Sequence, residues 1–224
     1  MSALRVAGVI GALAAAMAVP GTVGATSGDR DGDGLSNTFE IYKSKTSQYR
    51  ADTDRDGIRD DREDLDGDRL NNGKEQKARL DPLRRDSDRD GVNDRNEDTD
   101  RDGLTTVQEF AAAENPVDAD TDDDGLKDGH DDVDCDGLQN ETEFDGHTNP
   151  RVGDSDHDGV GDADEDSDHD GVNNDTEEAD GTDVSDADSD DDGADDGADV
   201  DADGDGENDD SETSEDFEDG SCDD

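Results

Sequence analysis

The sequence predicts an irregular, metal-stabilised repeat array with short helical turns and little regular secondary structure. Three observations lead to this fold class. Hydrophobic residues make up only 25% of the chain and tryptophan is absent. The formal net charge is -54. Aspartate-rich blocks of twelve residues recur along most of the chain. This small apolar surface cannot offset the conformational entropy that the chain loses on folding. An interaction other than hydrophobic collapse must therefore order it.

The first 25 residues differ from the rest and predict a signal peptide. They contain Arg5, an apolar run over residues 6–19, and then Pro20 and small residues. The run is short for a membrane span and typical of a signal-peptide core, the alternative being an uncleaved anchor. Val23 and Ala25 fit the small-residue rule at a cleavage site. We therefore expect a mature chain without a membrane span, secreted to the extracellular space or cell surface.

Residues 26–212 form a tandem array with a period of 34 residues. Its reference block is DTDRDGIRDDRE, which begins at Asp52, and a companion block begins twelve residues later. Blocks of the first series begin at Asp52, Asp86, Asp120, Asp154 and Asp188, and their companions at Asp64, Asp98, Asp132 and Asp166. A further block opens the array at Asp29, and the last begins at Asp201, one residue out of register.

Two classes of block differ at the ninth position. The first series has Asp there, and we call its members D loops; the companions and the opening block have Asn or Thr, and we call these N loops. The Asn or Thr precedes a Glu by three residues, as in a capping box, which predicts one or two helical turns, for example over residues 106–111. Connectors carry Asp81-Pro82, Asn115-Pro116 or Asn149-Pro150, and the proline fixes a turn.

The blocks follow the D-x-D-x-D-G-x5-E pattern of EF-hand calcium loops. Alternate carboxylates can point inward, Gly at the sixth position permits a sharp turn, and the carbonyl of the seventh residue supplies another oxygen. The ninth residue often acts through water, and Glu at the twelfth closes the shell. So many hard oxygen ligands suit calcium better than magnesium, and no Cys–His set favours a soft metal.

Three blocks each depart from the pattern at one position. Those at Asp120 and Asp188 end in Asp131 and Asp199, whose arms are shorter than that of Glu. The block at Asp64 has Arg69 where Gly belongs. A non-glycine residue in a left-handed turn costs about 1–2 kcal/mol, so we expect this site to be among the weakest.

The array resembles the thrombospondin type 3 repeat family, including its bacterial and archaeal secreted relatives. The resemblance covers residues 29–212 and is carried by DTDRDGIRDDRE, DSDRDGVNDRNE, DSDHDGVGDADE and the Asp/Asn-Pro connectors. It implies repeats that wrap calcium ions with little regular secondary structure, in extracellular adhesive or spacer regions. The animal repeats are laced with disulfides, whereas this chain has only Cys135 inside a loop, so its rigidity would depend more on metal.

The resemblance also implies the metal ligands, which are the acids at the first, third, fifth, ninth and twelfth positions. By block these are Asp29, Asp31, Asp33 and Glu40; Asp52, Asp54, Asp56, Asp60 and Glu63; Asp64, Asp66, Asp68 and Glu75; Asp86, Asp88, Asp90, Asp94 and Glu97; Asp98, Asp100, Asp102 and Glu109; Asp120, Asp122, Asp124, Asp128 and Asp131; Asp132, Asp134, Asp136 and Glu143; Asp154, Asp156, Asp158, Asp162 and Glu165; Asp166, Asp168, Asp170 and Glu177; Asp188, Asp190, Asp192, Asp196 and Asp199; and Asp201, Asp203, Asp205, Asp209 and Glu212.

The remaining features predict surface and tail. One apolar residue at the seventh position of most loops can stack neighbouring loops once metal has fixed them. His157 and His169, at the fourth position, should face solvent, away from the ion. Residues 213–224 are predicted to be an acidic disordered tail. The spacing of Cys135 and Cys222 leaves open whether they pair.

These observations predict an extracellular calcium-binding repeat protein that acts as a calcium-ordered spacer, scaffold or adhesion module. Its expected partners are calcium ions and other cell-surface or extracellular proteins. Nucleic acid is not expected, because its binding needs cationic surface. The alternative is a disordered polyanionic surface or mineral-interacting protein with non-specific cation binding. We do not expect an enzyme, because the sequence offers no nucleophile–base arrangement and no apolar pocket.

Overall fold

The computed structural model describes residues 28–204. The predicted signal peptide, the end of the block at Asp201 and the acidic tail lie outside this range. The described part contains short helices joined by irregular loops, and no β-strand. The α-helices are α1 (Asn37–Phe39), α2 (Asn72–Ala78), α3 (Thr106–Ala112), α4 (Asn140–Gly146) and α5 (Asn174–Asp180). The predicted low regularity is confirmed.

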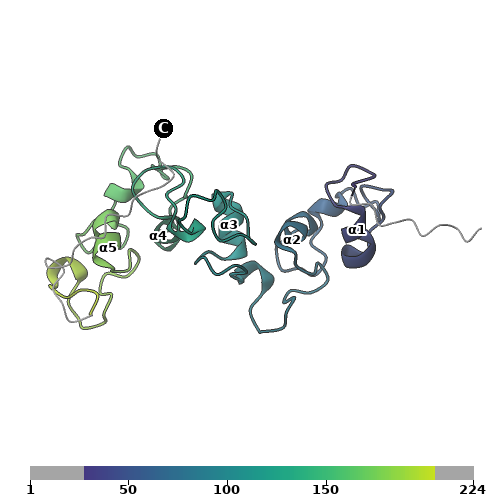
Figure 1. Ribbon diagram of the computed structural model, residues 1–224. Coiled ribbons are helices and arrows are strands. Elements are labelled where there is room, and N and C mark those ends of the chain that lie inside the picture. Colours follow the sequence, from purple (N-terminus) through teal and green to yellow (C-terminus); the bar gives the residue numbers. More distant parts are fainter. Residues whose placement is uncertain (1–27, 205–224) are drawn as a thin grey trace, which may run out of the picture.

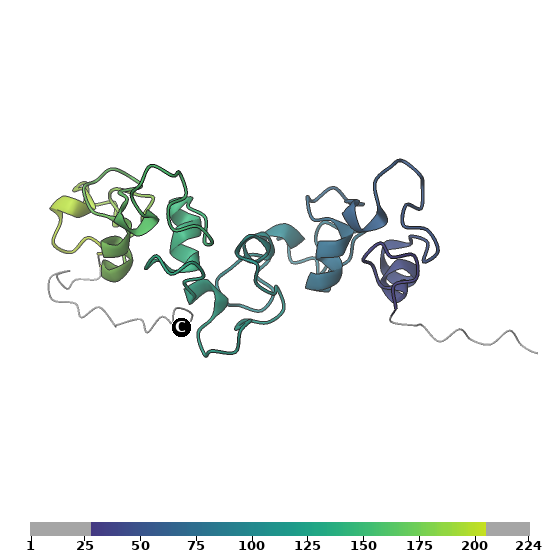
Figure 2. The same ribbon diagram turned by 90° about the horizontal axis from the view of Figure 1, so that it is seen from above.

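Short 3₁₀ turns alternate with the α-helices. They are η2 (Asp60–Arg62), η3 (Asp94–Asn96), η4 (Asp128–His130), η5 (Asp162–Asp164) and η6 (Asp196–Ala198), while α1 continues directly into a π-helical turn, η1 (Glu40–Ser44). Each α-helix begins at the ninth position of an N loop and each 3₁₀ turn at the ninth position of a D loop. Figures 1 and 2 show these units following one another in an elongated, bent array rather than around a common core.

Each helix cap lies one residue earlier than the capping-box interpretation predicts. The N-cap of α2 is Asn71, whose side chain accepts from the backbone N–H of Lys74. In α3 the capping box joins Thr105 to Gln108. The N-loop glutamate is therefore not needed for capping, and it is buried inside the loop instead.

A repeated backbone hydrogen bond closes the loops. The N–H of the ninth residue donates to the carbonyl just before the block, as from Asp60 to Ala51 at 3.0 Å and from Asn72 to Glu63 at 2.8 Å. The same bond occurs in every loop from the Asp29 loop to the Asp188 loop. The backbone alone thus closes each of these loops, without any contribution from side chains.

Every described loop turns through left-handed residues at two positions. Gly57 at the sixth position has φ +96°, as expected, and Arg69 takes the same place with φ +79°. The fourth position is also left-handed, with φ +67° at Arg55 and +72° at Arg89. The sequence pattern did not reveal this second turn, because residues as different as Arg, His and Cys occupy the fourth position.

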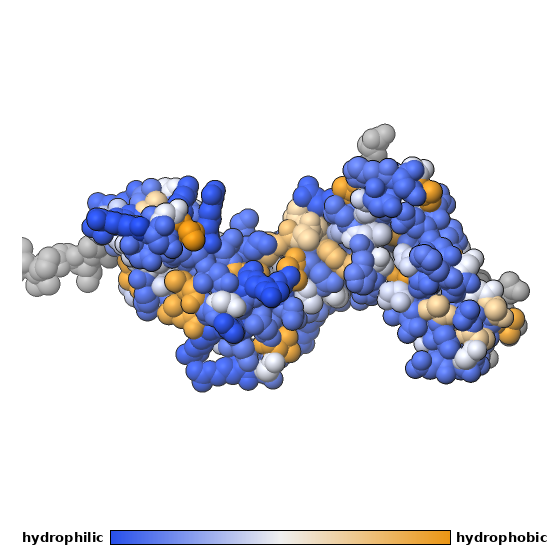
Figure 3. Space-filling view, turned by 180° about the vertical axis from the view of Figure 1, so that it is seen from behind, coloured by the Kyte–Doolittle hydropathy of each residue, from blue (hydrophilic) through white to orange (hydrophobic). Residues whose placement is uncertain are grey.

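The most buried seventh-position residues belong to N loops and the most exposed to D loops. Those of four N loops are at most 1% exposed, namely Leu35, Leu70, Leu104 and Leu138. In the D loops Ile58 is 47% exposed and Val92 41% exposed. Val172 of the Asp166 N loop and Leu126 and Ala194 of two D loops are half-buried. Figure 3 shows one face of the molecule, which is mostly hydrophilic with small, separate hydrophobic spots.

The loops touch one another through specific polar contacts. Asn72 Nδ2 donates to the carbonyl of Asp60 at 2.7 Å, which joins a D loop to the N loop that follows it. The N–H and hydroxyl of Ser36 donate to Gln76 Oε1 at 2.7 and 2.8 Å, which places α2 against the Asp29 loop. These contacts join the Asp64 loop to the Asp52 loop just before it and to the Asp29 loop beyond that.

Cys135 is disulfide-bonded, and the chain's other cysteine, Cys222, lies outside the described residues. Between residues 28 and 204, no helix combines the length and apolar character that crossing a bilayer requires.

Candidate metal centres

Each N loop gathers carboxylates around a buried glutamate. In the Asp64 loop, oxygens of Asp64, Asp66 and Asp68 lie within 4.8 Å of one another. Glu75 closes this group with 0% of its surface exposed, and neither of its oxygens has a hydrogen-bond partner. A buried, unpaired carboxylate is strongly unfavourable unless it is protonated or meets a cation. The donor set therefore fits a hard metal ion.

The arrangement of Glu75 recurs along the array. The twelfth-position glutamates of the other N loops are also 0% exposed, namely Glu40, Glu109, Glu143 and Glu177. Both oxygens lack a hydrogen-bond partner in each of them except Glu143, where one oxygen accepts from Thr148 at 3.4 Å. Five buried acids in equivalent places point to a common counter-ion rather than to a local irregularity.

The pKa values of these glutamates are raised by the same burial. Burial raises the pKa of Glu75 to about 9, with further contributions from the negative charges of Asp66, Asp68 and Asp94. The pKa of Glu109 is likewise raised to about 9 by burial and neighbouring carboxylates. Both effects disfavour the charged form. A divalent ion bound among the carboxylates would favour their charged forms instead, because it would attract each of them at contact distance.

The D loops form a more open version of the site. Oxygens of Asp52, Asp54 and Asp56 lie within 4.8 Å of one another, but Asp54 and Asp56 are exposed and Glu63 is half-buried. Burial and the charge of Asp60 raise the pKa of Glu63 to about 7, less far than in the N loops. Water can therefore serve as part of the coordination shell in a D loop.

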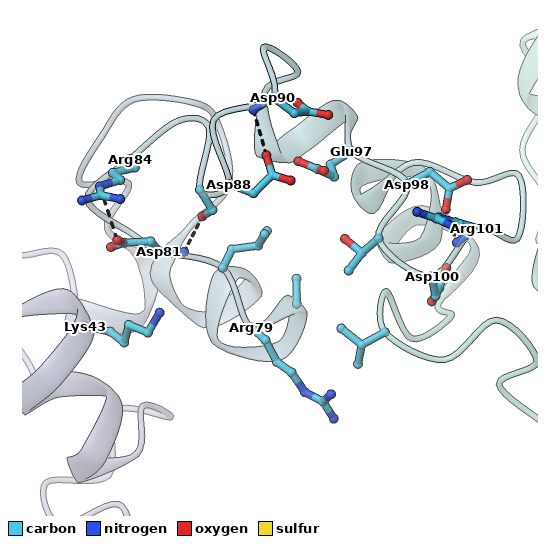
Figure 4. Close-up of a pocket in the computed structure, with 15 residues that line it drawn as sticks. Lys43, Arg79, Asp81, Arg84, Asp88, Asp90, Glu97, Asp98, Asp100 and Arg101 are labelled. Carbon is cyan, nitrogen blue, oxygen red and sulfur yellow. Dashed lines mark hydrogen bonds and ion pairs between the residues drawn. The ribbon is translucent and has the colours of Figure 1, made fainter.

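Figure 4 shows the open character of a D loop. Asp88, Asp90 and Glu97 of the Asp86 loop line a cavity of about 920 Å³. Asp88 accepts a hydrogen bond from the N–H of Asp90 at 3.0 Å, which leaves its second oxygen available. Arg84 pairs with Asp81 at 3.6 Å beside Asp88. The lining is mainly charged, so the cavity suits ions and water rather than an apolar ligand.

A second-position hydroxyl holds the ninth-position aspartate of each D loop. Thr53 donates to Asp60 twice, from its N–H at 2.8 Å and from its hydroxyl at 2.7 Å. The same two bonds join Ser87 to Asp94, Thr121 to Asp128, Ser155 to Asp162, and Ser189 to Asp196. Sequence reasoning missed this pair, although the recurring Ser or Thr at the second position of the D loops was a usable signal.

The ninth-position aspartate also faces the preceding N loop. Oxygens of Asp60, Asp33 and Glu40 lie within 4.8 Å of one another, and all three residues are buried. Asp94, Asp128, Asp162 and Asp196 lie near enough to the glutamates of the N loops before them for their negative charges to help raise the pKa of those glutamates. The structure thus brings together acids that the sequence pattern assigns to different blocks.

The incomplete loops keep much of this geometry. Despite Arg69, the Asp64 loop gathers its carboxylates, and the N–H of Arg69 donates to Asp64 at 3.0 Å as glycine does elsewhere. Asp131 at the end of the Asp120 loop is buried, and burial raises its pKa to about 7. Asp199 instead accepts from the N–H groups of Val200 and Asp201. Asp205, Asp209 and Glu212 lie outside the described residues.

The two histidines of interest lie on the surface. His157 and His169 are exposed, as predicted, and Nδ1 of His157 is hydrogen-bonded to the carbonyl of Asp154 at 2.6 Å.

Comparison of the chain with protein-family models, with curated proteins and with solved structures finds no match.

Proposed function

We propose that this chain is an extracellular calcium-binding repeat protein of the thrombospondin type 3 kind, in which bound calcium orders a spacer, scaffold or adhesion module. One observation carries the proposal: the N-loop glutamates are buried with unpartnered oxygens beside three aspartates each. Such groups need a cation, and oxygen-only donors select a hard one.

The size of the donor set favours calcium over magnesium. An N loop offers carboxylates from its first, third, fifth and twelfth positions, together with the carbonyl of the seventh residue. Calcium accepts six to eight oxygens in flexible geometry, whereas magnesium requires a tight octahedron and retains water. Extracellular modules of this type bind calcium at about 10⁻⁴–10⁻³ M.

The shape of the molecule supports a structural role for the array. The units lie in a row, and each packs on its neighbours rather than on a shared core (Figures 1 and 2). Stability in such arrays is a sum of unit terms and neighbour contacts. Calcium would therefore set the stiffness of a spacer along its whole length.

Calcium titration of the chelated protein tests the proposal. Circular dichroism and hydrodynamic radius should both change on addition of millimolar calcium, and calorimetry should show a defined stoichiometry. Magnesium at equal concentration is the control and should give the smaller change. An identical radius and spectrum in EDTA and in calcium would reject the proposal.

Glycine variants separate folded loops from a diffuse polyanion. Gly57, Gly91 and Gly159 have φ between +96° and +104°. Valine at these positions would be strained. The triple variant Gly57→Val, Gly91→Val, Gly159→Val should lose calcium sites. Unchanged calcium binding would indicate non-specific association with a charged chain instead.

A further inference from the structure

Asp60 makes contacts in three directions. Its N–H donates to Ala51 and its carbonyl accepts from Asn72, so its backbone fixes the Asp52 loop against the Asp64 loop. Its carboxylate accepts from both the N–H and the hydroxyl of Thr53. The same carboxylate lies within 4.8 Å of Asp33 and Glu40, which belong to the loop on the other side of the connector.

The bonds to Thr53 leave Asp60 able to bind a metal. A carboxylate has about four lone-pair sites, and Thr53 occupies two of them. The remaining sites are available to an ion shared with the unpartnered oxygens of Asp33 and Glu40. The hydrogen bonds to Thr53 also fix the orientation of the carboxylate, as outer-shell partners do for ligands in metal sites.

The two loops are held in close contact around this position. The guanidinium of Arg59 donates to the carbonyl of Gly32 at 2.8 Å across the connector. In another unit, Lys127 donates to the carbonyl of Arg101 at 2.5 Å. A Cβ on Gly129 would lie 2.7 Å from the Asp102 carbonyl, so the backbones of the two loops are in direct contact there.

We propose that the ninth-position aspartate of each D loop is a ligand of the ion held by the N loop before it. Each such ion then ties together two loops that are separated by a connector. The residues concerned are Asp60, Asp94, Asp128, Asp162 and Asp196. The inference rests on the proposed calcium function and adds to it the missing ligand and the pairing of loops.

This pairing differs from the one that sequence spacing suggests. Adjacent blocks are only twelve residues apart, yet the bond between Asn72 and Asp60 joins them through an amide and a carbonyl. The carboxylates are shared across the connector instead. The cooperative unit is therefore an N loop, its connector and the next D loop, and calcium release from an N loop frees the connector as well.

The tyrosines provide a local reporter for the first unit. The chain has two tyrosines and no tryptophan. Tyr42 follows Glu40 closely in sequence, and the guanidinium of Arg30 in the Asp29 loop lies 4.4 Å from the ring centre of Tyr49. Terbium luminescence excited through tyrosine therefore reports ions in the Asp29 and Asp52 loops. Asp54→Asn serves as the background variant, because it weakens the Asp52 loop.

In this background, Asp60→Asn should weaken terbium binding at the Asp29 loop by about tenfold or more, in the range seen for lost metal-site partners. Asparagine keeps the shape of the side chain and an acceptor for the N–H of Thr53. Asp94→Asn is the matched control: it changes the equivalent residue of the next unit and should leave the tyrosine-excited signal unchanged. Thr53→Val keeps the Asp60 carboxylate and should weaken binding less than Asp60→Asn.

The outcomes separate the two proposals. If calcium displaces terbium from the unsubstituted protein but Asp60→Asn binds as tightly as its background, the shared ligand is rejected while the calcium function stands. Equal losses in Thr53→Val and Asp60→Asn would also reject it, because Asp60 would then act only through the hydrogen bond from the Thr53 hydroxyl. If the unsubstituted protein gives no calcium-displaceable signal, the calcium function itself fails.

Discussion

The Thr53 hydroxyl donates a 2.7 Å hydrogen bond to the carboxylate of Asp60, seven residues further along the chain. The bond joins the second and ninth positions of the Asp52 loop, next to the backbone hydrogen bond from the N–H of Asp60 to the carbonyl of Ala51. The D loops are thus closed by a side chain as well as by the backbone. Equivalent hydroxyl–carboxylate bonds close the other D loops up to the Asp188 loop.

Removing one of these hydroxyls should destabilise the array locally. Ser155→Ala deletes the hydroxyl that donates to Asp162 and accepts from the N–H of Asn149, and hydrogen bonds to charged groups contribute about 1.5–3 kcal/mol. Ser167→Ala is the control, because alanine retains the N–H that donates to Asn174. Thermal unfolding in saturating calcium should show a lower midpoint for Ser155→Ala than for Ser167→Ala. Equal midpoints would contradict a closing role for the hydroxyl.

The buried glutamates should matter more for calcium than the half-buried ones. Glu75→Gln removes a carboxylate whose oxygens have no other partner, whereas Glu97→Gln changes the half-buried equivalent in a D loop. Calorimetry should show the larger loss of affinity for Glu75→Gln. The same variant should stabilise the metal-free fold, since it removes a buried acid. A larger effect from Glu97→Gln would reverse the assigned order of the sites.

Replacing Arg69 should strengthen the Asp64 loop. Arg69 has φ +79°, so Arg69→Gly relieves about 1–2 kcal/mol of strain and should tighten calcium binding by about fivefold or more. Arg69→Ala is the control, because it removes the same charge and retains the Cβ. Calcium titration of both variants distinguishes backbone strain from charge. Equal tightening in the two variants would attribute the effect to charge.

The raised pKa values predict opposite pH dependences for the metal-free and calcium-bound protein. Burial raises the pKa of Glu75 from an ordinary 4.5 to about 9, so the metal-free fold retains a proton that the unfolded chain loses. Stability of the metal-free fold should therefore be fully present below about pH 4.5 and fall as pH rises toward 9. Calcium needs the ionised form, so its affinity should increase over the same range.

Calorimetry in buffers of different ionisation enthalpy measures this linkage. At neutral pH calcium binding should release protons, and Glu75→Gln should release fewer than the unsubstituted protein. Glu141→Gln, an exposed residue on the same type of helix as Glu75, is the control and should not change the number released. Absence of proton release near pH 7 would contradict protonated glutamates in the metal-free fold.

Sequence spacing predicted the local chemistry better than the contacts between loops. The spacing of Asp64, Asp66 and Asp68 fixes which carboxylates converge, because alternate residues around a glycine turn point to one side. A short helix at Thr106 also follows from local propensity. These features depend only on residues close in the chain, and the structure contains both.

The contacts of Asp60 with Asp33 and Glu40 could not be predicted in the same way. The distance between them in sequence spans a connector whose path depends on packing between loops. Likewise, the motif gives Leu70 and Ile58 the same position, yet one is buried and the other is 47% exposed. Leu70 packs with Ala78 of α2 and with Leu80, whereas the loop of Ile58 is followed only by a 3₁₀ turn.

The Ser36–Gln76 contact shows that a unit rests on the one before it. No described residue of such a junction requires a partner from the far end of the molecule. Gene segments encoding one 34-residue period could consequently be duplicated or lost, and each new junction would match those already present. Such events would change the length of the molecule and leave the fold of each loop unchanged. Selection can therefore adjust molecular length in steps of one period.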